Sequence, residues 1–112
     1  MRALFALVFA VLMAFASDIS IATYNVQNLF DCKDDGSEYP DFKSSTSKWD
    51  CEAASSKLKR TRQVIDAINT DIIALEEVEN EQVLKALVDG SEYKFIAFSK
   101  AKNSPVGLAL IS

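Results

Sequence analysis

The chain has no histidine and no excess of positive charge. The 112 residues contain no His, and their formal net charge is −4. The first absence removes the commonest general base and a common metal ligand. The second gives no sign of the basic stripe that usually marks a nucleic-acid-binding surface. Any hydrolytic chemistry would therefore run on carboxylates, amides and a metal ion, or be incomplete.

Cysteine is also scarce. The chain has two, Cys32 and Cys51, which flank a polar segment. Without His or further Cys, this pair does not match a zinc site. In an oxidising compartment the two could form a bridge, which would close a loop of about 20 residues and contribute around 3 kcal/mol. Two unpaired thiols are the alternative.

The first 16 residues have the pattern of a secretory signal peptide. A short positive start at Met1 and Arg2 precedes an apolar run from Ala3 to Ala16, which ends in a small-x-small cleavage site. The run is shorter than the roughly 20 residues that a membrane span needs. An uncleaved anchor or a buried core segment is the alternative. We expect a secreted or periplasmic protein with no membrane anchor after cleavage.

The mature chain, residues 17–112, is long enough for one small domain of mixed helices and strands. Period-two alternation predicts strands, and apolar residues at helical spacing predict helices. The expected elements are a strand at 19–26, a polar loop at 32–56, a helix at 57–69, a strand at 72–75, a helix at 81–88, and strands at 93–98 and 106–111. This order indicates an α/β or α+β fold.

The helix at 57–69 is rich in basic residues. They are Lys57, Lys59, Arg60 and Arg62. With Ser55 or Ser56 as the N-cap, these cations would lie near the helix N-terminus, where the helix dipole favours acids. One interpretation is a basic patch for an anionic substrate, and the other is a solvated helix face. In the loop before it, Phe42 and Trp49 are expected to pin the chain to the body of the domain.

Three carboxylates follow the apolar run Ile72 to Leu75. They are Glu76, Glu77 and Glu79, and Asn80 after them is a candidate cap for the next helix. A short apolar run reads as a buried strand, so the acids would lie where that strand emerges. Acids are costly to bury unless they are paired or bound to metal. The cluster is a candidate site, with solvated loop acids as the alternative; strand alternation would send Glu76 and Glu77 to opposite faces.

Two amides lie at the end of the first strand. Asn28 is interpreted as a turn former. Asn25 shares a strand face with Ile19 and Ile21, so we expect its amide at the end of the sheet beside buried groups.

Three segments resemble the endonuclease/exonuclease/phosphatase superfamily, the metal-dependent phosphodiesterases and phosphatases related to deoxyribonuclease I and exonuclease III. Residues 21–31 resemble its opening motif, residues 71–80 its second motif, and residues 105–112 the Gly-containing strand that follows. The second motif is usually written Gln-Glu-Val, and here Glu76 replaces the Gln. The resemblance covers the mature chain but only the N-terminal part of the family's domain. The resemblance implies that the chain forms the N-terminal part of a two-sheet α/β sandwich and that the sandwich is incomplete.

Carried over to this chain, the resemblance implies a metal site. Glu77 would be the carboxylate that binds the catalytic divalent ion, and Asn25 the amide beside it that helps to hold metal or phosphate. Mg²⁺ is the implied ion, with Mn²⁺ or Ca²⁺ as alternatives, because such ions prefer oxygen ligands. The implied partner is a nucleic acid or another phosphate ester. The substrate-binding residues stay unknown.

The family's later motifs have no match in this sequence. They carry an Asp with an Asn, and an Asp-His pair that activates water. The chain also stops at Ser112, after an apolar strand that should have neighbours on both edges. We therefore expect the chain to be part of an exported phosphodiesterase, with endonuclease as the leading activity. We expect it to be inactive without the C-terminal part of its domain. The alternatives are a secreted binding or relic domain on the same scaffold, or a phosphatase or phospholipid phosphodiesterase.

Overall fold

The fold is that of a computed structural model, which describes residues 17–112. The predicted signal peptide at 1–16 lies outside the described residues. The elements are β1 (Ile21–Leu29), the 3-10 helix η1 (Pro40–Phe42), α2 (Cys51–Ile68), β2 (Ile72–Val78), α3 (Glu81–Val88), β3 (Ile96–Ser99) and β4 (Gly107–Ile111). Strands and helices alternate through most of the chain, so the predicted mixed α/β class is confirmed.

The described strands form one mixed sheet in the order β1-β2-β4-β3. β1 and β2 are parallel and are joined by α2, whereas β4 runs antiparallel to both β2 and β3. Gly107 opens β4, and a Cβ at this position would clash with the backbone oxygen of Ser99. The glycine therefore lets the two strands of the β3–β4 hairpin approach closely.

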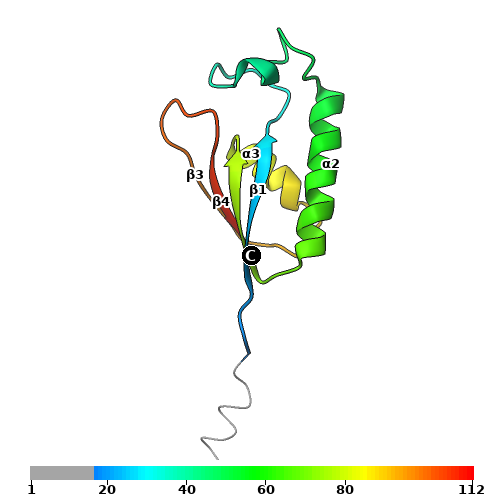
Figure 1. The fold of residues 1–112 in the computed structure, drawn as a ribbon, viewed down its shortest axis with the longest axis vertical. Coiled ribbons are helices and arrows are strands. Elements are labelled where there is room, and N and C mark those ends of the chain that lie inside the picture. Colours follow the sequence, from blue (N-terminus) through cyan, green and yellow to red (C-terminus); the bar gives the residue numbers. More distant parts are fainter. Residues whose placement is uncertain (1–16) are drawn as a thin grey trace, which may run out of the picture.

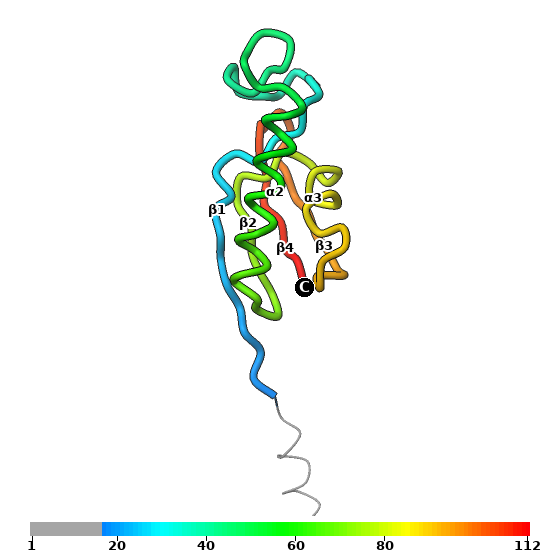
Figure 2. Tube along the Cα trace, turned by 90° about the vertical axis from the view of Figure 1, so that its right-hand side faces the viewer, coloured from blue at the N-terminus to red at the C-terminus, as the bar shows by residue number. Residues whose placement is uncertain are grey.

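Both α-helices cover the same face of the sheet (Figures 1 and 2). Alternate residues of the strands point into this layer and meet the apolar stripes of the helices. The fully buried members include Val26, Leu29, Ile65, Ile73, Leu75, Leu84, Leu87 and Ile111. The described core therefore lies between the sheet and one layer of helices.

The other face of the sheet is open among residues 17–112. Its large apolar side chains include Ile21, Leu108 and Leu110, which are 67%, 62% and 50% exposed. A hollow of about 440 Å³ on this face is lined mainly by apolar residues, with Glu76 at its margin. Asn25 belongs to this exposed face. The prediction that Asn25 would lie beside buried groups with Ile19 and Ile21 is therefore wrong within the described residues.

The start of α2 differs from the prediction. The helix begins at Cys51, and the Asp50 side chain accepts a hydrogen bond from the Ala53 N–H at 2.8 Å. The polar loop therefore ends at Asp50 and not at residue 56, and neither Ser55 nor Ser56 is the cap. Asp50 and Glu52 place negative charge at the helix N-terminus, so the expected mismatch with the helix dipole disappears.

The second helix follows the prediction closely. Asn80 caps α3 by accepting a hydrogen bond from the Val83 N–H at 2.8 Å, and the helix ends at Val88. Arg62 of α2 donates to the backbone oxygens of Leu87 and Asp89 at 3.2 and 2.7 Å, just where α3 leaves its last carbonyls unpaired. This basic residue therefore ties the two helices together.

No helix among the described residues is long and apolar enough to span a bilayer. The other strand bounds differ from the predicted ones by a few residues, and two differences matter. β1 continues to Leu29 and β2 to Val78, so Asn25, Asn28, Glu76 and Glu77 all lie within strands. Among the described residues, β1 pairs with β2 alone, whereas β2 pairs with β1 and β4. The residues of interest therefore lie on paired strands and not in loops.

Candidate metal centre

The candidate site lies where the parallel strands β1 and β2 lose their regular register. Asn25 pairs with Glu76, but the next paired residues are Leu29 and Val78, so both strands bulge in between. The backbone φ angles at the bulges are positive: 54° at Gln27, 62° at Asn28 and 64° at Glu77. Non-glycine residues seldom adopt this conformation, and such outliers cluster at functional sites.

The two bulges bring Glu77 against the end of β1. One carboxylate oxygen of Glu77 accepts a hydrogen bond from Asn25 Nδ2 at 2.9 Å, and the other accepts from the Asn28 backbone N–H at 3.1 Å. Glu77 thus contacts Asn25. Regular strand alternation would have turned Glu77 away from the face of the sheet that Asn25 and Glu76 share. The reason is the bulge, which inserts a residue and redirects the side chain.

The amide of Asn25 has a defined orientation. Its oxygen accepts a hydrogen bond from the Gln27 N–H at 2.8 Å, while its nitrogen faces the Glu77 carboxylate. The flipped amide would set oxygen against carboxylate and nitrogen against N–H, so it is excluded by the network. Asn25 therefore positions Glu77. Its predicted role as a metal ligand stays a prediction, since its oxygen already has one donor.

Asn28 also belongs to this site, through its backbone N–H. It was expected to form a turn, and its positive φ agrees with that. The same conformation directs its N–H at Glu77, which makes it a second donor to the carboxylate. Asn is among the residues that tolerate this conformation best, and that was the available signal.

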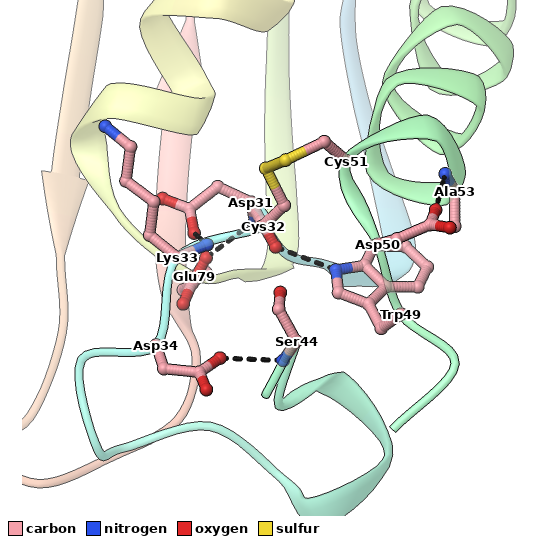
Figure 3. The surroundings of a disulfide bond; sticks show 10 residues. All are labelled: Asp31, Cys32, Lys33, Asp34, Ser44, Trp49, Asp50, Cys51, Ala53 and Glu79. Carbon is pink, nitrogen blue, oxygen red and sulfur yellow. Dashed lines mark hydrogen bonds between the residues drawn. A yellow bond between two sulfur atoms is a disulfide. The ribbon is translucent and has the colours of Figure 1, made fainter. Parts of the chain in front are cut away.

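A second group of acids, which the sequence did not predict as a unit, lies beyond the strand ends. Asp35, Glu38 and Glu79 each offer an oxygen, and these oxygens lie within 4.8 Å of one another. Glu79 is only 1% exposed and accepts a hydrogen bond from the Asp31 N–H at 2.7 Å (Figure 3). Burial, together with repulsion from Asp31, Asp35 and Glu38, raises the pKa of Glu79 to about 7.

The loop that carries these acids is held by the disulfide and by aromatic packing. Cys32 and Cys51 are joined, which fixes the end of β1 to the first residue of α2 (Figure 3). Phe42 stacks on Phe30 with ring centroids 4.5 Å apart, and Trp49 donates to the Asp31 backbone oxygen at 2.7 Å. The prediction that Phe42 and Trp49 pin this loop is confirmed. The loop lies at the end of the sheet where β1 ends (Figure 1).

Asp71, which precedes β2, belongs to the opposite end of the sheet. It accepts hydrogen bonds from the Ser20 N–H and hydroxyl at 2.7 and 2.8 Å, and these bonds lower the pKa of Asp71. Asp71 therefore joins the starts of β1 and β2. The acids of the 71–80 stretch thus divide into a structural residue at one end and a candidate site at the other.

A mixed sheet with helices on one face defines an α/β protein, and the amide-held carboxylate at its strand bulge is a candidate ligand for a cation. The sequence profile of the Endonuclease/Exonuclease/phosphatase family matches residues 20–111, and the chain belongs to this family. No curated protein and no solved structure matches the chain. The family membership supports a hydrolase of the phosphodiesterase, nuclease or phosphatase type, generally one that depends on a divalent metal.

The residues present fit half of such a metal site. Glu77 is a carboxylate in a fixed orientation, and each of its oxygens keeps a lone pair for a cation beside the hydrogen bond it accepts. Mg²⁺ is commonly held by one or two carboxylates, with water and substrate phosphate completing its shell. The donor set at this bulge is therefore suited to a hard divalent ion, with one protein carboxylate supplied from β2.

Proposed function

We propose that the protein is the N-terminal part of an exported, metal-dependent phosphodiesterase, an endonuclease that acts on DNA or RNA. The observation that carries the proposal is the Glu77 carboxylate, oriented by Asn25 and by the Asn28 N–H in a chain of this family. Mg²⁺ is the ion that this carboxylate would hold.

The chemistry divides between the ion and the chain. When bound, the ion supplies a Lewis acid that polarises a phosphoryl oxygen and stabilises the leaving oxygen. The chain fixes where the charge of Glu77 points, because two donors hold its oxygens in place. Positioning of this kind is worth much in a site that must place a phosphate within a fraction of an ångström.

Activation of water is the step that these residues do not provide. The sequence has no His, and the lone pairs that the Glu77 carboxylate keeps beside its hydrogen bonds are the ones assigned to the cation. In-line attack on phosphorus benefits from a base within hydrogen-bond reach of the nucleophile. We therefore propose that the chain is inactive alone and that the rest of the domain supplies this group.

The open face of the sheet supports the same proposal. An apolar sheet face that includes Leu108 and Leu110 exposes large side chains that ordinarily lie against a second layer. We propose that the missing part of the domain packs on this face. Export is supported by the leader pattern at 1–16 and by the disulfide, because disulfides persist in oxidising compartments.

A turnover assay tests the function. The purified chain is incubated with plasmid DNA, a bis-aryl phosphate and an aryl phosphomonoester, each with Mg²⁺ or Mn²⁺. We expect turnover no higher than that of Glu77→Gln. Robust metal-dependent turnover that Glu77→Gln abolishes would establish the hydrolase and refute the inactivity, and the preferred ester would separate phosphodiesterase from phosphatase.

The downstream reading frame gives a second test. A continuation that carries the Asp-x-Asn and Asp-His motifs is the expected result. A stop directly after Ser112 would contradict the enzyme and favour a secreted binding or relic domain.

A further inference from the structure

Three of the four basic residues on α2 have no carboxylate partner in the described part of the chain. The ion pairs among residues 17–112 are Arg62 with Asp66 and Lys85 with Glu81. Lys57, Lys59 and Arg60 are in neither of them. Of these three, Lys57 and Arg60 lie one helical turn apart on the same side of α2, where like charges destabilise a helix. An anion held between them would relieve that repulsion.

The topology sets Lys57 at the level of the candidate metal centre. The end of α2 turns directly into the start of β2, so the helix runs back along the strand. Lys57 lies about 17 Å along the axis from Ile68, at 1.5 Å per helical residue. Glu77 lies about 17 Å along β2 from Ile72, at 3.3 Å per strand residue.

The electrostatics of Lys57 agree with this placement. Lys57 is half-buried, whereas its neighbours Lys59 and Arg60 are exposed. Burial lowers the pKa of the Lys57 ammonium, repulsion from Arg60 lowers it further, and attraction to the Glu77 carboxylate opposes both. The ammonium therefore lies within the field of Glu77 yet has given up part of its hydration without gaining a counter-ion.

We propose that Lys57, assisted by Arg60, forms an anion subsite that contacts a phosphate group of the substrate beside the ion held by Glu77. The inference rests on the proposed function and deepens it, since it names residues that recognise the phosphate. Lysine is a common phosphate ligand, and its attraction to a dianion is strongest where water is partly excluded. Arg62 takes no part, because its guanidinium is engaged with Asp66 and with the end of α3.

The test measures the affinity of the purified chain for inorganic phosphate, with and without Mg²⁺, by NMR titration. Loss of one charge-assisted contact should weaken phosphate binding about tenfold in Lys57→Gln and about threefold in Arg60→Gln. Lys59→Gln removes the same charge from the exposed side of the same helix and should change the affinity by less than about twofold. Lys57→Arg should restore most of the binding.

The Mg²⁺ affinity of the same variants separates a phosphate contact from a structural role. We expect Lys57→Gln to bind Mg²⁺ at least as well as the natural chain, because a repelling cation has been removed. Weaker Mg²⁺ binding in Lys57→Gln would mean that Lys57 holds Glu77 in place, and equal phosphate affinities of Lys57→Gln and Lys59→Gln would overturn the subsite. Failure of the natural chain to bind Mg²⁺ would instead refute the proposed function, while the phosphate titration without metal still decides the subsite.

Discussion

Glu77 and Glu79 lie two residues apart at the end of β2 and meet opposite surroundings. Glu77 lies at the strand bulge, partly exposed, and its carboxylate is held by donors from β1. Glu79 is buried under the disulfide-bound loop beside Glu38 and Asp35, and its pKa is raised to about 7. Neighbouring acids of one motif can therefore differ in kind: the first is arranged to meet a cation at the surface, and the second is costly to ionise.

The largest change in the difference between Glu77 and Glu79 should come from removal of the disulfide, because the disulfide closes the loop that covers Glu79. In Cys32→Ser/Cys51→Ser we expect the free energy of unfolding to fall by about 3 kcal/mol, from the entropy of the released loop. The carboxylate of Glu79 should then gain water and titrate nearer its ordinary pKa. Urea unfolding and NMR titration of the Glu79 carboxyl measure the two effects.

A control for this variant comes from the metal centre. The hydrogen bonds to Glu77 come from β1 and not from the loop, so Mn²⁺ affinity should change by less than about threefold. If the variant without the disulfide lost its affinity for Mn²⁺, the surroundings of Glu77 and Glu79 would not be independent of each other.

Neutralising Glu79 should remove a pH dependence. Its folded-state pKa of about 7 lies above the ordinary value, so its contribution to stability is complete at low pH and is lost as the pH rises toward 7 and above. In Glu79→Gln, the free energy of unfolding at pH 8 should exceed that of the natural chain by about 2 kcal/mol. Chemical unfolding between pH 5 and 8 measures the difference.

Glu92→Gln provides the matched change at an exposed acid. It removes one negative charge from an exposed side chain, so the free energy of unfolding should change by less than about 0.5 kcal/mol. Identical slopes in the natural chain and in Glu79→Gln would contradict the burial of a costly carboxylate.

The smallest of the three effects should come from Asn25. Removing the amide in Asn25→Ala leaves Glu77 with the Asn28 N–H as its donor, and loss of such an orienting partner weakens metal binding about tenfold. Stability should change by less than about 1 kcal/mol, since the side chain is exposed. Calorimetric Mn²⁺ titration measures the affinity. Thr23→Ala, an exposed neighbour on the same face, should leave it unchanged.

Much of the fold could be predicted because local patterns agree with it. The strands around Ile73 and Ile111, the Asn80 cap and the α3 stripe all follow directly from periodicity and capping rules. The start of α2 was missed because residues 51–56 carry no apolar stripe, so that turn rests on its Asp50 cap and on the disulfide. Tertiary context decided that boundary.

The site could be predicted in part for the same reason. Glu77 and Asn25 stand out by type and by position at strand ends, and the structure brings them into contact. Their geometry could not be predicted, because it depends on positive φ at Gln27 and Glu77 as well as at Asn28, and of these three residue types only Asn favours that conformation. The burial of Glu79 was equally hidden, since it depends on a loop that folds back from residues 31–50.

The measurement that tests the central claim most directly is paramagnetic broadening of backbone amide NMR signals by Mn²⁺. Glu77 as the metal carboxylate predicts that the signals of Asn28, Glu77 and Val78 broaden first, at substoichiometric Mn²⁺, and that Glu77→Gln abolishes the effect. First broadening at Gly36 and Glu38, unchanged in Glu77→Gln, would place the ion at the buried acids beside Glu79 and would contradict the assignment of Glu77.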